Sequence, residues 1–217
     1  MYYDLHTHHF PEGNEDICTI VNISAPYPPL EGAGGGNYSV GIHPWYIQKD
    51  NIEKELDLIE KYASSPNVKA IGECGLDKLC ETDFELQKEV FLSHISISEK
   101  VKKPLIIHCV KSFDEIILLK KKIQPKQAWI IHGFRGKPQQ AKQLIEQGFY
   151  LSFGLNFNEQ TIQNIPIERI FLETDDSGCD IRTIYKSAAR ALNIPEENLI
   201  RQIEKNICEI FKYPYLT

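Results

Sequence analysis

The chain has 217 residues, of which 42% are hydrophobic and 25% are charged, the balance of a globular protein rather than a disordered or fibrous one. It carries 24 lysines and arginines against 30 aspartates and glutamates, which excludes a protein that gathers a long polyanion through its overall field. No apolar run approaches the roughly 20 residues that cross a bilayer, and we expect no secretory signal. These features predict a cytoplasmic protein that does not contact membranes.

The length favours a single domain over residues 1–217, since α/β barrels often use about this many residues as one domain. Six cysteines are scattered without a CxxC pair, so we expect free thiols rather than disulfides or a thiolate zinc site. Nothing in the sequence indicates an obligate protein partner.

Eight short apolar runs alternate with longer segments of helical period, which predicts parallel βα units. This number of strands, without a phosphate-loop fingerprint, favours an α/β fold of the (β/α)8 TIM barrel type over an open doubly wound sheet. The predicted strands are Tyr2–His6, Ile17–Asn22, Tyr38–Ile42, Val68–Gly72, Leu105–His108, Trp129–His132, Tyr150–Phe153 and Ile170–Glu173. The predicted helices are Asn51–Ala63, Asp83–Val101, Ser112–Ile123, Pro138–Gln147, Ile181–Leu192 and Pro195–Phe211.

The first two intervals between strands do not read as helices. Phe10–Asp16 is too short for a stable helix, and Ser24–Asn37 is rich in proline and glycine. The GAGGG stretch in the second interval lacks the Lys-Ser/Thr that follows a phosphate-binding loop. We therefore predict an abbreviated barrel, with loops replacing the helices after strands 1 and 2.

Residues of metal-binding type stand at or just beyond the ends of five predicted strands. A lone histidine at a strand end is usually structural, but in a barrel the carboxyl ends of all strands converge on one face. His6 and His8 are two positions apart on an extended chain, so their side chains project to the same side. The sequence therefore predicts one metal centre formed by His6, His8, Glu73, His108, His132 and Asp175.

Imidazole and carboxylate ligands without thiolate suit zinc, manganese, iron or nickel, and suit magnesium less well. We expect one or two divalent ions, whose identity the sequence leaves open between zinc, manganese, nickel and magnesium. Two such ions would leave the centre positive, which favours a phosphate ester as substrate. Glu73 would bridge the ions and Asp175 would take the proton from a water activated by the metal. The predicted reaction class is metal-assisted hydrolysis.

The sequence resembles the TatD family, metal-dependent hydrolases of the amidohydrolase-like barrel group that are described as deoxyribonucleases. The resemblance rests on DLHTHH near the start, GIHPW at 41–45, AIGECGLD at 70–77, PLIIHC at 104–109, IIHGFRG at 130–136 and FLETD at 171–175. It implies that the six residues named above match the family's metal ligands and that Asp175 is the catalytic base. Val110 stands where the family often has arginine, and Asp176-Ser177-Gly178 replaces a longer basic loop. These departures concern the substrate rather than the metal.

Three further residues are candidates for binding substrate. His43 ends the third predicted strand and either holds a substrate phosphate or has a structural role. Lys111 and Arg135 follow predicted ligand strands, where they either clamp a phosphate or remain solvated rim charges.

Three other side chains have more local interpretations. Trp45 either stacks a base or packs against its own loop. Asp77 is interpreted as a carboxylate that orients a ligand histidine or a loop. His94 lies within a predicted helix, where we expect a surface or core-edge residue.

The leading hypothesis is a phosphodiesterase or deoxyribonuclease of TatD type that acts on DNA ends or on a small phosphodiester. A small-substrate amidohydrolase or lactonase is the alternative, because the same metal centre polarises a carbonyl equally well. A metal-bound interaction module without turnover is the third possibility. The sequence does not distinguish exonuclease from endonuclease activity.

Overall fold

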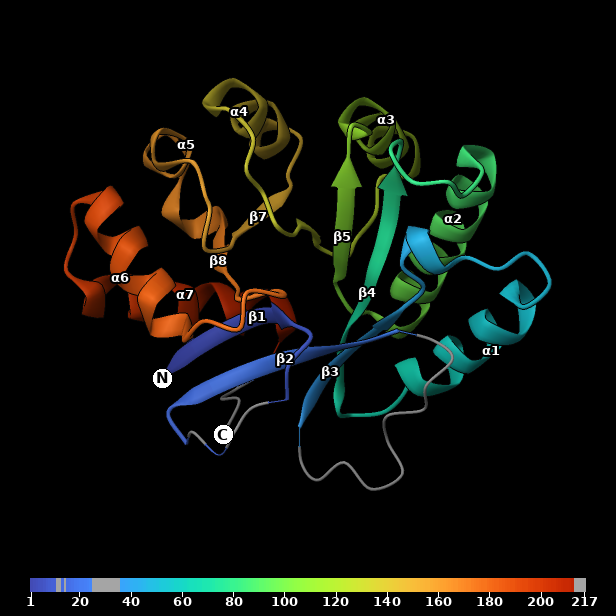
Figure 1. The fold of residues 1–217 in the computed structure, drawn as a ribbon, viewed down its shortest axis with the longest axis horizontal. Helices are drawn as coiled ribbons and strands as arrows, with labels where there is room; N and C mark the ends of the chain where they lie inside the picture. The colour runs from blue at the N-terminus through green and yellow to red at the C-terminus, as the bar shows by residue number, and fades with distance from the viewer. Residues whose placement is uncertain (11–12, 14, 25–35, 213–217) are drawn as a thin grey trace. The chain divides into compact units, whose positions relative to one another are not determined.

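The computed structural model describes residues 1–10, 13, 15–24 and 36–212 (Figure 1). The chain forms two compact units: a first unit of residues 1–21 and 131–217, and a second unit of residues 22–130. It passes from one to the other within strands β2 (Ile17–Ser24) and β6 (Trp129–Ile131). The eight strands follow one another in the sheet in their sequence order, β1 to β8.

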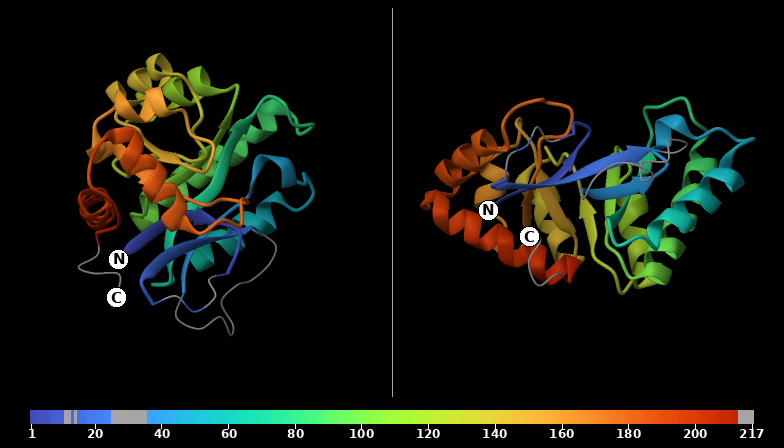
Figure 2. Two further views of the ribbon diagram at one scale, coloured as in Figure 1. Left: turned by 60° about the vertical axis from the view of Figure 1, so that its left-hand side comes forward. Right: turned by 90° about the horizontal axis from the view of Figure 1, so that it is seen from below.

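The first unit contains both ends of the described chain. Strand β1 (Tyr2–Thr7) pairs in parallel with β2, and β7 (Tyr150–Phe153) pairs in parallel with β8 (Ile170–Leu172). A bridge between Thr7 and Asp175 continues this arrangement from β8 to β1. The helices of this unit are α4 (Pro138–Glu146), α5 (Glu159–Gln163), α6 (Ile181–Leu192) and α7 (Glu196–Phe211), of which α6 and α7 pack together on β8 and β1 (Figure 2).

The second unit is built around a long central strand. Strand β4 (Val68–Asp77) pairs in parallel with β3 (Asn37–Gly41) on one side and with β5 (Leu105–Val110) on the other. All ten residues of β4 are buried, as expected for a parallel strand covered on both faces. The helices of this unit are α1 (Ile52–Ala63), α2 (Phe84–Val101) and α3 (Phe113–Ile123), and α1 and α2 pack against β4 (Figure 1).

Capping residues explain where two of the longer helices begin. Asp83 precedes α2, and its side chain accepts a hydrogen bond from the backbone of Leu86. Asp180 precedes α6 and accepts from the backbone of Arg182 in the same way. Such caps satisfy amide groups that a helix leaves free at its N-terminus.

All eight predicted strands are confirmed, but the prediction for the fourth was too short. Strand β4 runs five residues beyond Gly72, so Glu73 and Asp77 lie within the strand rather than after it. Gly72 and Gly75 have φ angles of 138° and 147°, and a Cβ at either position would collide with the neighbouring backbone of β5. These two glycines therefore allow β4 and β5 to approach closely.

The six predicted helices are also confirmed, with bounds that agree within one residue. The sequence did not predict the short helices α5, η1 (Pro44–Tyr46) and η2 (Ile167–Arg169), because three to five residues show no helical period. No helix occurs between β1 and β3 in the residues that the structure describes. Much of the loops predicted there, residues 11, 12, 14 and 25–35 including most of the GAGGG stretch, lies outside the described residues.

Two further expectations concern the cysteines and membrane-spanning helices. The six cysteines are free, as predicted. Among the described helices, none combines the length and the apolar composition that a bilayer span requires.

Candidate functional site

In the first unit, a carboxylate lies beside two histidines of strand β1. The Nε2 atoms of His6 and His8 lie 3.6 Å and 3.5 Å from the same oxygen, Oδ1 of Asp175. These separations are longer than a hydrogen bond. Two ligands about 2.1 Å from a tetrahedral ion are themselves about 3.4 Å apart, so the spacing fits ligands that share one cation.

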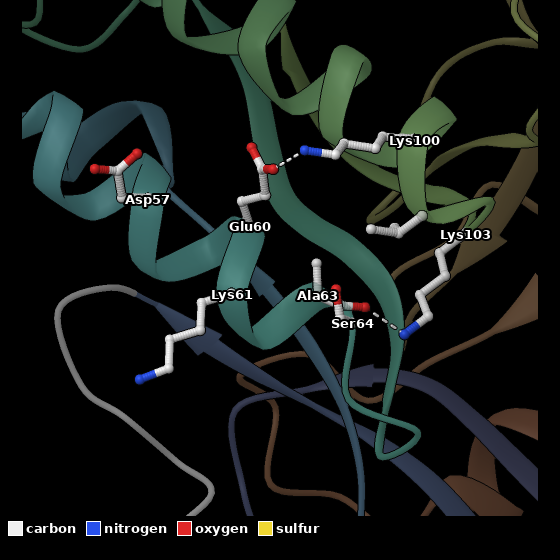
Figure 3. Close-up of a pocket in the computed structure, with 8 residues that line it drawn as sticks. Asp57, Glu60, Lys61, Ala63, Ser64, Lys100 and Lys103 are labelled. Carbon is white, nitrogen blue, oxygen red and sulfur yellow. Dashed lines mark hydrogen bonds and ion pairs between the residues drawn. The ribbon is translucent and has the colours of Figure 1, made fainter.

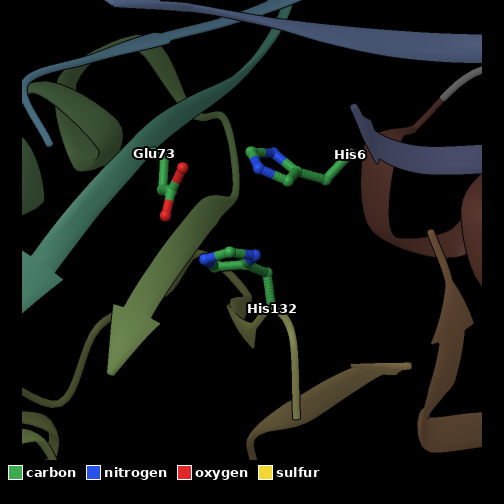
Figure 4. Close-up of side chains that lie close together, drawn as sticks. All are labelled: His6, Glu73 and His132. Carbon is green, nitrogen blue, oxygen red and sulfur yellow. The ribbon is translucent and has the colours of Figure 1, made fainter. Parts of the chain in front are cut away.

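His132 joins this group from the end of β6. Its ring centroid lies 4.5 Å from that of His6, and the two rings are tilted by 52° (Figure 4). His6 is fully buried, whereas the side chain of His8 is 32% exposed and that of Asp175 is 28% exposed. The cluster is therefore buried at its base and open to solvent at His8 and Asp175.

The turn after β8 holds Asp175 in place through its backbone. The Asp175 amide donates to the carbonyl of His6 at 2.9 Å, and the Thr7 hydroxyl donates to the Asp175 carbonyl at 3.2 Å. Asp4 accepts hydrogen bonds from the amide and hydroxyl of Thr174 at 3.0 Å and 2.7 Å. Burial raises the pKa of Asp4 to about 7, although the hydrogen bonds from Thr174 lower it. The position of Asp175 thus depends on strand β1 rather than on its own side chain.

Glu173 is a site residue that the sequence interpretation missed. It is fully buried, and its Oε1 lies 3.4 Å from Nδ1 of His132 and accepts from the Gly133 amide at 2.5 Å. Its Oε2 is buried without a hydrogen-bond partner among the described residues, which is costly for a carboxylate. A nearby cation would reduce that cost. The available signal was its position directly after the apolar run of β8, at the same end of a strand as the other candidates.

The second unit has its own carboxylate between two histidines. Oε1 of Glu73 lies 3.1 Å from Nε2 of His43 and 2.8 Å from Nδ1 of His108. Glu73 is only 4% exposed, and its amide donates to Oδ1 of Asn22 at 2.7 Å. His43, which the sequence assigned to a substrate phosphate or to a structural role, is thus also placed to contribute a metal ligand with Glu73 and His108.

Asp77 contacts the other nitrogen of His108, as predicted for a carboxylate that orients a ligand histidine. Its Oδ2 lies 3.3 Å from Nε2 of His108 and accepts from Nε1 of Trp45 at 2.7 Å. Burial works against ionisation of Asp77, but the hydrogen bonds from Trp45, Leu79 and His108 outweigh it and lower the pKa. An ionised Asp77 favours a proton on Nε2 of His108, which would leave the lone pair of Nδ1 available on the side of Glu73.

His94 is fully buried, so the prediction of a surface or core-edge position was wrong. Its Nε2 accepts a hydrogen bond from the amide of Ile42 at 3.0 Å, and its Nδ1 lies 2.8 Å from the carbonyl of Val90. A helical period shows which positions share a face. It does not show that a polar side chain on that face will bond the backbone just beyond a neighbouring strand. His94 anchors the residue that precedes His43.

Acid is expected to weaken this anchor. Burial lowers the pKa of His94 from 6.5 to about 4, so the unfolded chain takes up a proton before the folded chain does. The contribution of neutral His94 to the free energy of unfolding is complete above about pH 6.5. It is lost as the pH falls towards 4, by about 3 kcal/mol in total. His94→Gln, which keeps a neutral donor and acceptor, should reduce this pH dependence in urea unfolding measured from pH 7.5 to 4.5. Equal slopes for both proteins would contradict the assignment.

Lys111 and Arg135, the two predicted phosphate ligands, are both exposed. Lys111 directly follows β5 and has a left-handed φ of 54°. Arg135 lies between β6 and α4. Their contact with a phosphate stays a prediction.

A cavity of about 790 Å³ in the second unit lies between α1 and α2 and contains none of the predicted site residues (Figure 3). Lys103 in its wall donates to the carbonyls of Ala63 and Ser65 at the end of α1. Burial, and then the charge of Lys69, lower the pKa of Lys103 to about 8. These lysine contacts cap a helix terminus, so we do not place the active site there.

Comparisons with known proteins identify a family and several relatives that this chain resembles. Residues 33–212 match the family model described as TatD related DNase. An uncharacterized metal-dependent hydrolase of Buchnera aphidicola subsp. Baizongia pistaciae is 32% identical over 92% of this chain and 81% of its own. The deoxyribonuclease Tat-D of Schizosaccharomyces pombe is 28% identical over 66% of this chain and 52% of its own.

The solved structures confirm the predicted fold class. The TatD homologue YjjV of Escherichia coli K12 has a TM-score of 0.80 with this chain, at 18% identity over 98% of both chains. Together with the strand order and the interleaved helices, this likeness establishes the (β/α)8 barrel fold.

Proposed function

The chain belongs to the TatD family of metal-dependent hydrolases, and from that premise we propose that it is a phosphodiesterase acting on DNA ends or small phosphodiesters. The observation that carries this proposal recurs in both units: one carboxylate oxygen lies close to two imidazole nitrogens, Asp175 beside His6 and His8, and Glu73 beside His43 and His108.

The donor atoms suit divalent cations. In the first unit His6, His8 and Asp175 would hold an ion, with His132 close by, and in the second unit Glu73 and His108 would do so with His43. Imidazole and carboxylate donors without thiolate match zinc, manganese or nickel, with magnesium less favoured. The spacing around Asp175 and the buried Oε2 of Glu173 support this assignment. A bound ion would lower the pKa of water and stabilise charge on the phosphoryl group.

Asp175 is the residue that we assign to proton transfer. Its side chain is partly exposed, so water and substrate can reach it, while backbone bonds to β1 fix its position. As the general base, its carboxylate takes the proton from the attacking water, a role worth about 10² to 10⁴ in rate. Lys111 and Arg135 are the exposed cations assigned to substrate phosphates.

Metal removal combined with a substrate panel tests this function. Protein stripped by a chelator should lose phosphodiester hydrolysis by at least about a hundredfold, and zinc, manganese, nickel or magnesium added singly should identify the ion that restores it. The panel contains single-stranded DNA, bis-p-nitrophenyl phosphate and a set of lactones. Turnover of lactones alone would overturn the phosphodiesterase in favour of a carbonyl hydrolase. No metal-dependent turnover of any substrate would favour an interaction module.

A further inference from the structure

Three large apolar side chains of the second unit are exposed near the group formed by Glu73, His43 and His108. Trp45 is 56% exposed, Tyr46 is 57% exposed and Leu79 is 72% exposed. The rings of Trp45 and Tyr46 both lie against His43, and Asp77 bonds both Trp45 and the Leu79 amide, and exposed apolar groups that adjoin one another often mark a binding site. We propose that these three residues, the aromatic platform, bind an unpaired nucleobase of the substrate, an inference that rests on the proposed phosphodiesterase function.

A single buried carboxylate holds two members of the platform. Asp77, only 2% exposed, accepts from Nε1 of Trp45 through Oδ2 and from the Leu79 amide through Oδ1, both at 2.7 Å. The indole ring also packs edge-on against His43, with ring centroids 4.8 Å apart. A ring that is fixed before binding loses little entropy when a ligand stacks on it. The exposure of Trp45 is therefore not that of a loose surface side chain.

Hydrogen bonds from Gln87 of helix α2 hold the turn that carries Leu79. The side-chain amide of Gln87 accepts from the Asp77 amide at 2.8 Å and donates to the carbonyls of Asp77 and Thr82 at 3.0 Å and 2.8 Å. Gln87 is itself 1% exposed. The platform consequently rests on a rigid turn and on the short helix η1.

Distance and charge favour a nucleotide unit as the occupant. The indole centroid lies 5.9 Å from that of His108, so a base on Trp45 would lie close to the candidate metal ligands of the second unit. Two lysines lie at the adjoining ends of β4 and β5, where the Lys78 amide donates to the Val110 carbonyl. The side chain of Lys78 is 41% exposed and pairs with Glu115. Lys111, which follows Val110, is also exposed. Lys78 directly precedes Leu79 in the chain, and aromatic side chains combined with basic groups are used by proteins that bind single strands.

A base that stacks on the platform must have one of its faces free. Within a duplex both faces of a base are stacked on neighbouring bases. An unpaired base at the end of a strand exposes that face, and stacking depends little on which base it is. The platform therefore predicts preference for single-stranded ends over duplexes, with little base specificity.

Tryptophan fluorescence tests the platform without any turnover. The chain has two tryptophans, and the second, Trp129, is fully buried. A single-stranded oligothymidine added in the presence of chelator should quench the emission of Trp45 saturably. Trp45→Phe should remove this quenching while it keeps an aromatic ring. The affinity of a labelled strand, measured by anisotropy, should fall at least about tenfold in Trp45→Ala and in Tyr46→Ala.

The control variant is Leu118→Ala, which changes a leucine of similar exposure, 65% against 72% for Leu79, on helix α3. It should bind as the unmodified protein does, whereas Leu79→Ala should bind about threefold more weakly. Circular dichroism verifies that each variant is folded. If Trp45→Ala does not fold, the fluorescence result for Trp45→Phe still tests the proposal. Unchanged affinity in folded Trp45→Ala and Tyr46→Ala, or equal affinity for an abasic strand, would overturn the platform. Because this assay needs no hydrolysis, its failure is distinct from failure of the proposed function.

Discussion

Replacing Asp175 with asparagine is expected to lower kcat for phosphodiester hydrolysis by about a thousandfold, within the range that a general base contributes. Asparagine has the same shape but cannot accept the proton. The backbone bonds that hold residue 175, from its amide to His6 and from Thr7 to its carbonyl, do not involve the side chain. The variant should therefore fold normally, which a thermal melt would show beside the kinetic measurement.

Asp176→Asn provides a matched control for this experiment. It makes the same chemical change at the next position, where the side chain is exposed. We expect its kcat to stay within about twofold of the unmodified protein. If Asp175→Asn retained activity within tenfold of the unmodified protein, Asp175 would not be the base.

The second large effect concerns metal binding. The double variant His6→Ala, His8→Ala removes both imidazoles that lie near Oδ1 of Asp175, so the affinity of the first unit for a divalent ion should fall by at least about a hundredfold. Removing even a group that only supports a ligand typically costs 10- to 100-fold. Competition with a chromophoric chelator measures this affinity directly.

Loss of a fully buried ring such as His6 could also destabilise the fold, so the partly exposed His8 is changed alone as well. His9→Ala removes a neighbouring exposed imidazole and should leave the affinity unchanged. If His8→Ala and His9→Ala bound metal equally well, His8 would not be a ligand.

Much of this fold was predictable because its strands have strong local signals. Runs such as those before His108 and His132 are uniformly apolar, as buried parallel strands require. The limits of β4 were not predictable, because Gly72 and Gly75 resemble turn residues unless the close approach of β5 is known. The short helix η1 was missed for a related reason, since its place depends on bonds to His43 rather than on a periodic pattern.

The candidate site shows the same division between local and tertiary information. The pairing of His6 with His8 follows from strand geometry, and their closeness to Asp175 follows from the adjacency of β1 and β8. The hydrogen bond from His94 to Ile42 could not be predicted in this way. Bonds of this kind join side chains from different elements, so they depend on the tertiary packing of helix against strand.

Anomalous diffraction from crystals grown with zinc or manganese tests the central claim most directly, because it locates the ion rather than its effects. We predict a peak within coordination distance, about 2 to 2.2 Å, of Nε2 of His6 and His8 and of a carboxylate oxygen of Asp175. Ordered side chains at these positions with no anomalous peak among them, in crystals whose solution activity depends on the same ion, would contradict the proposed centre.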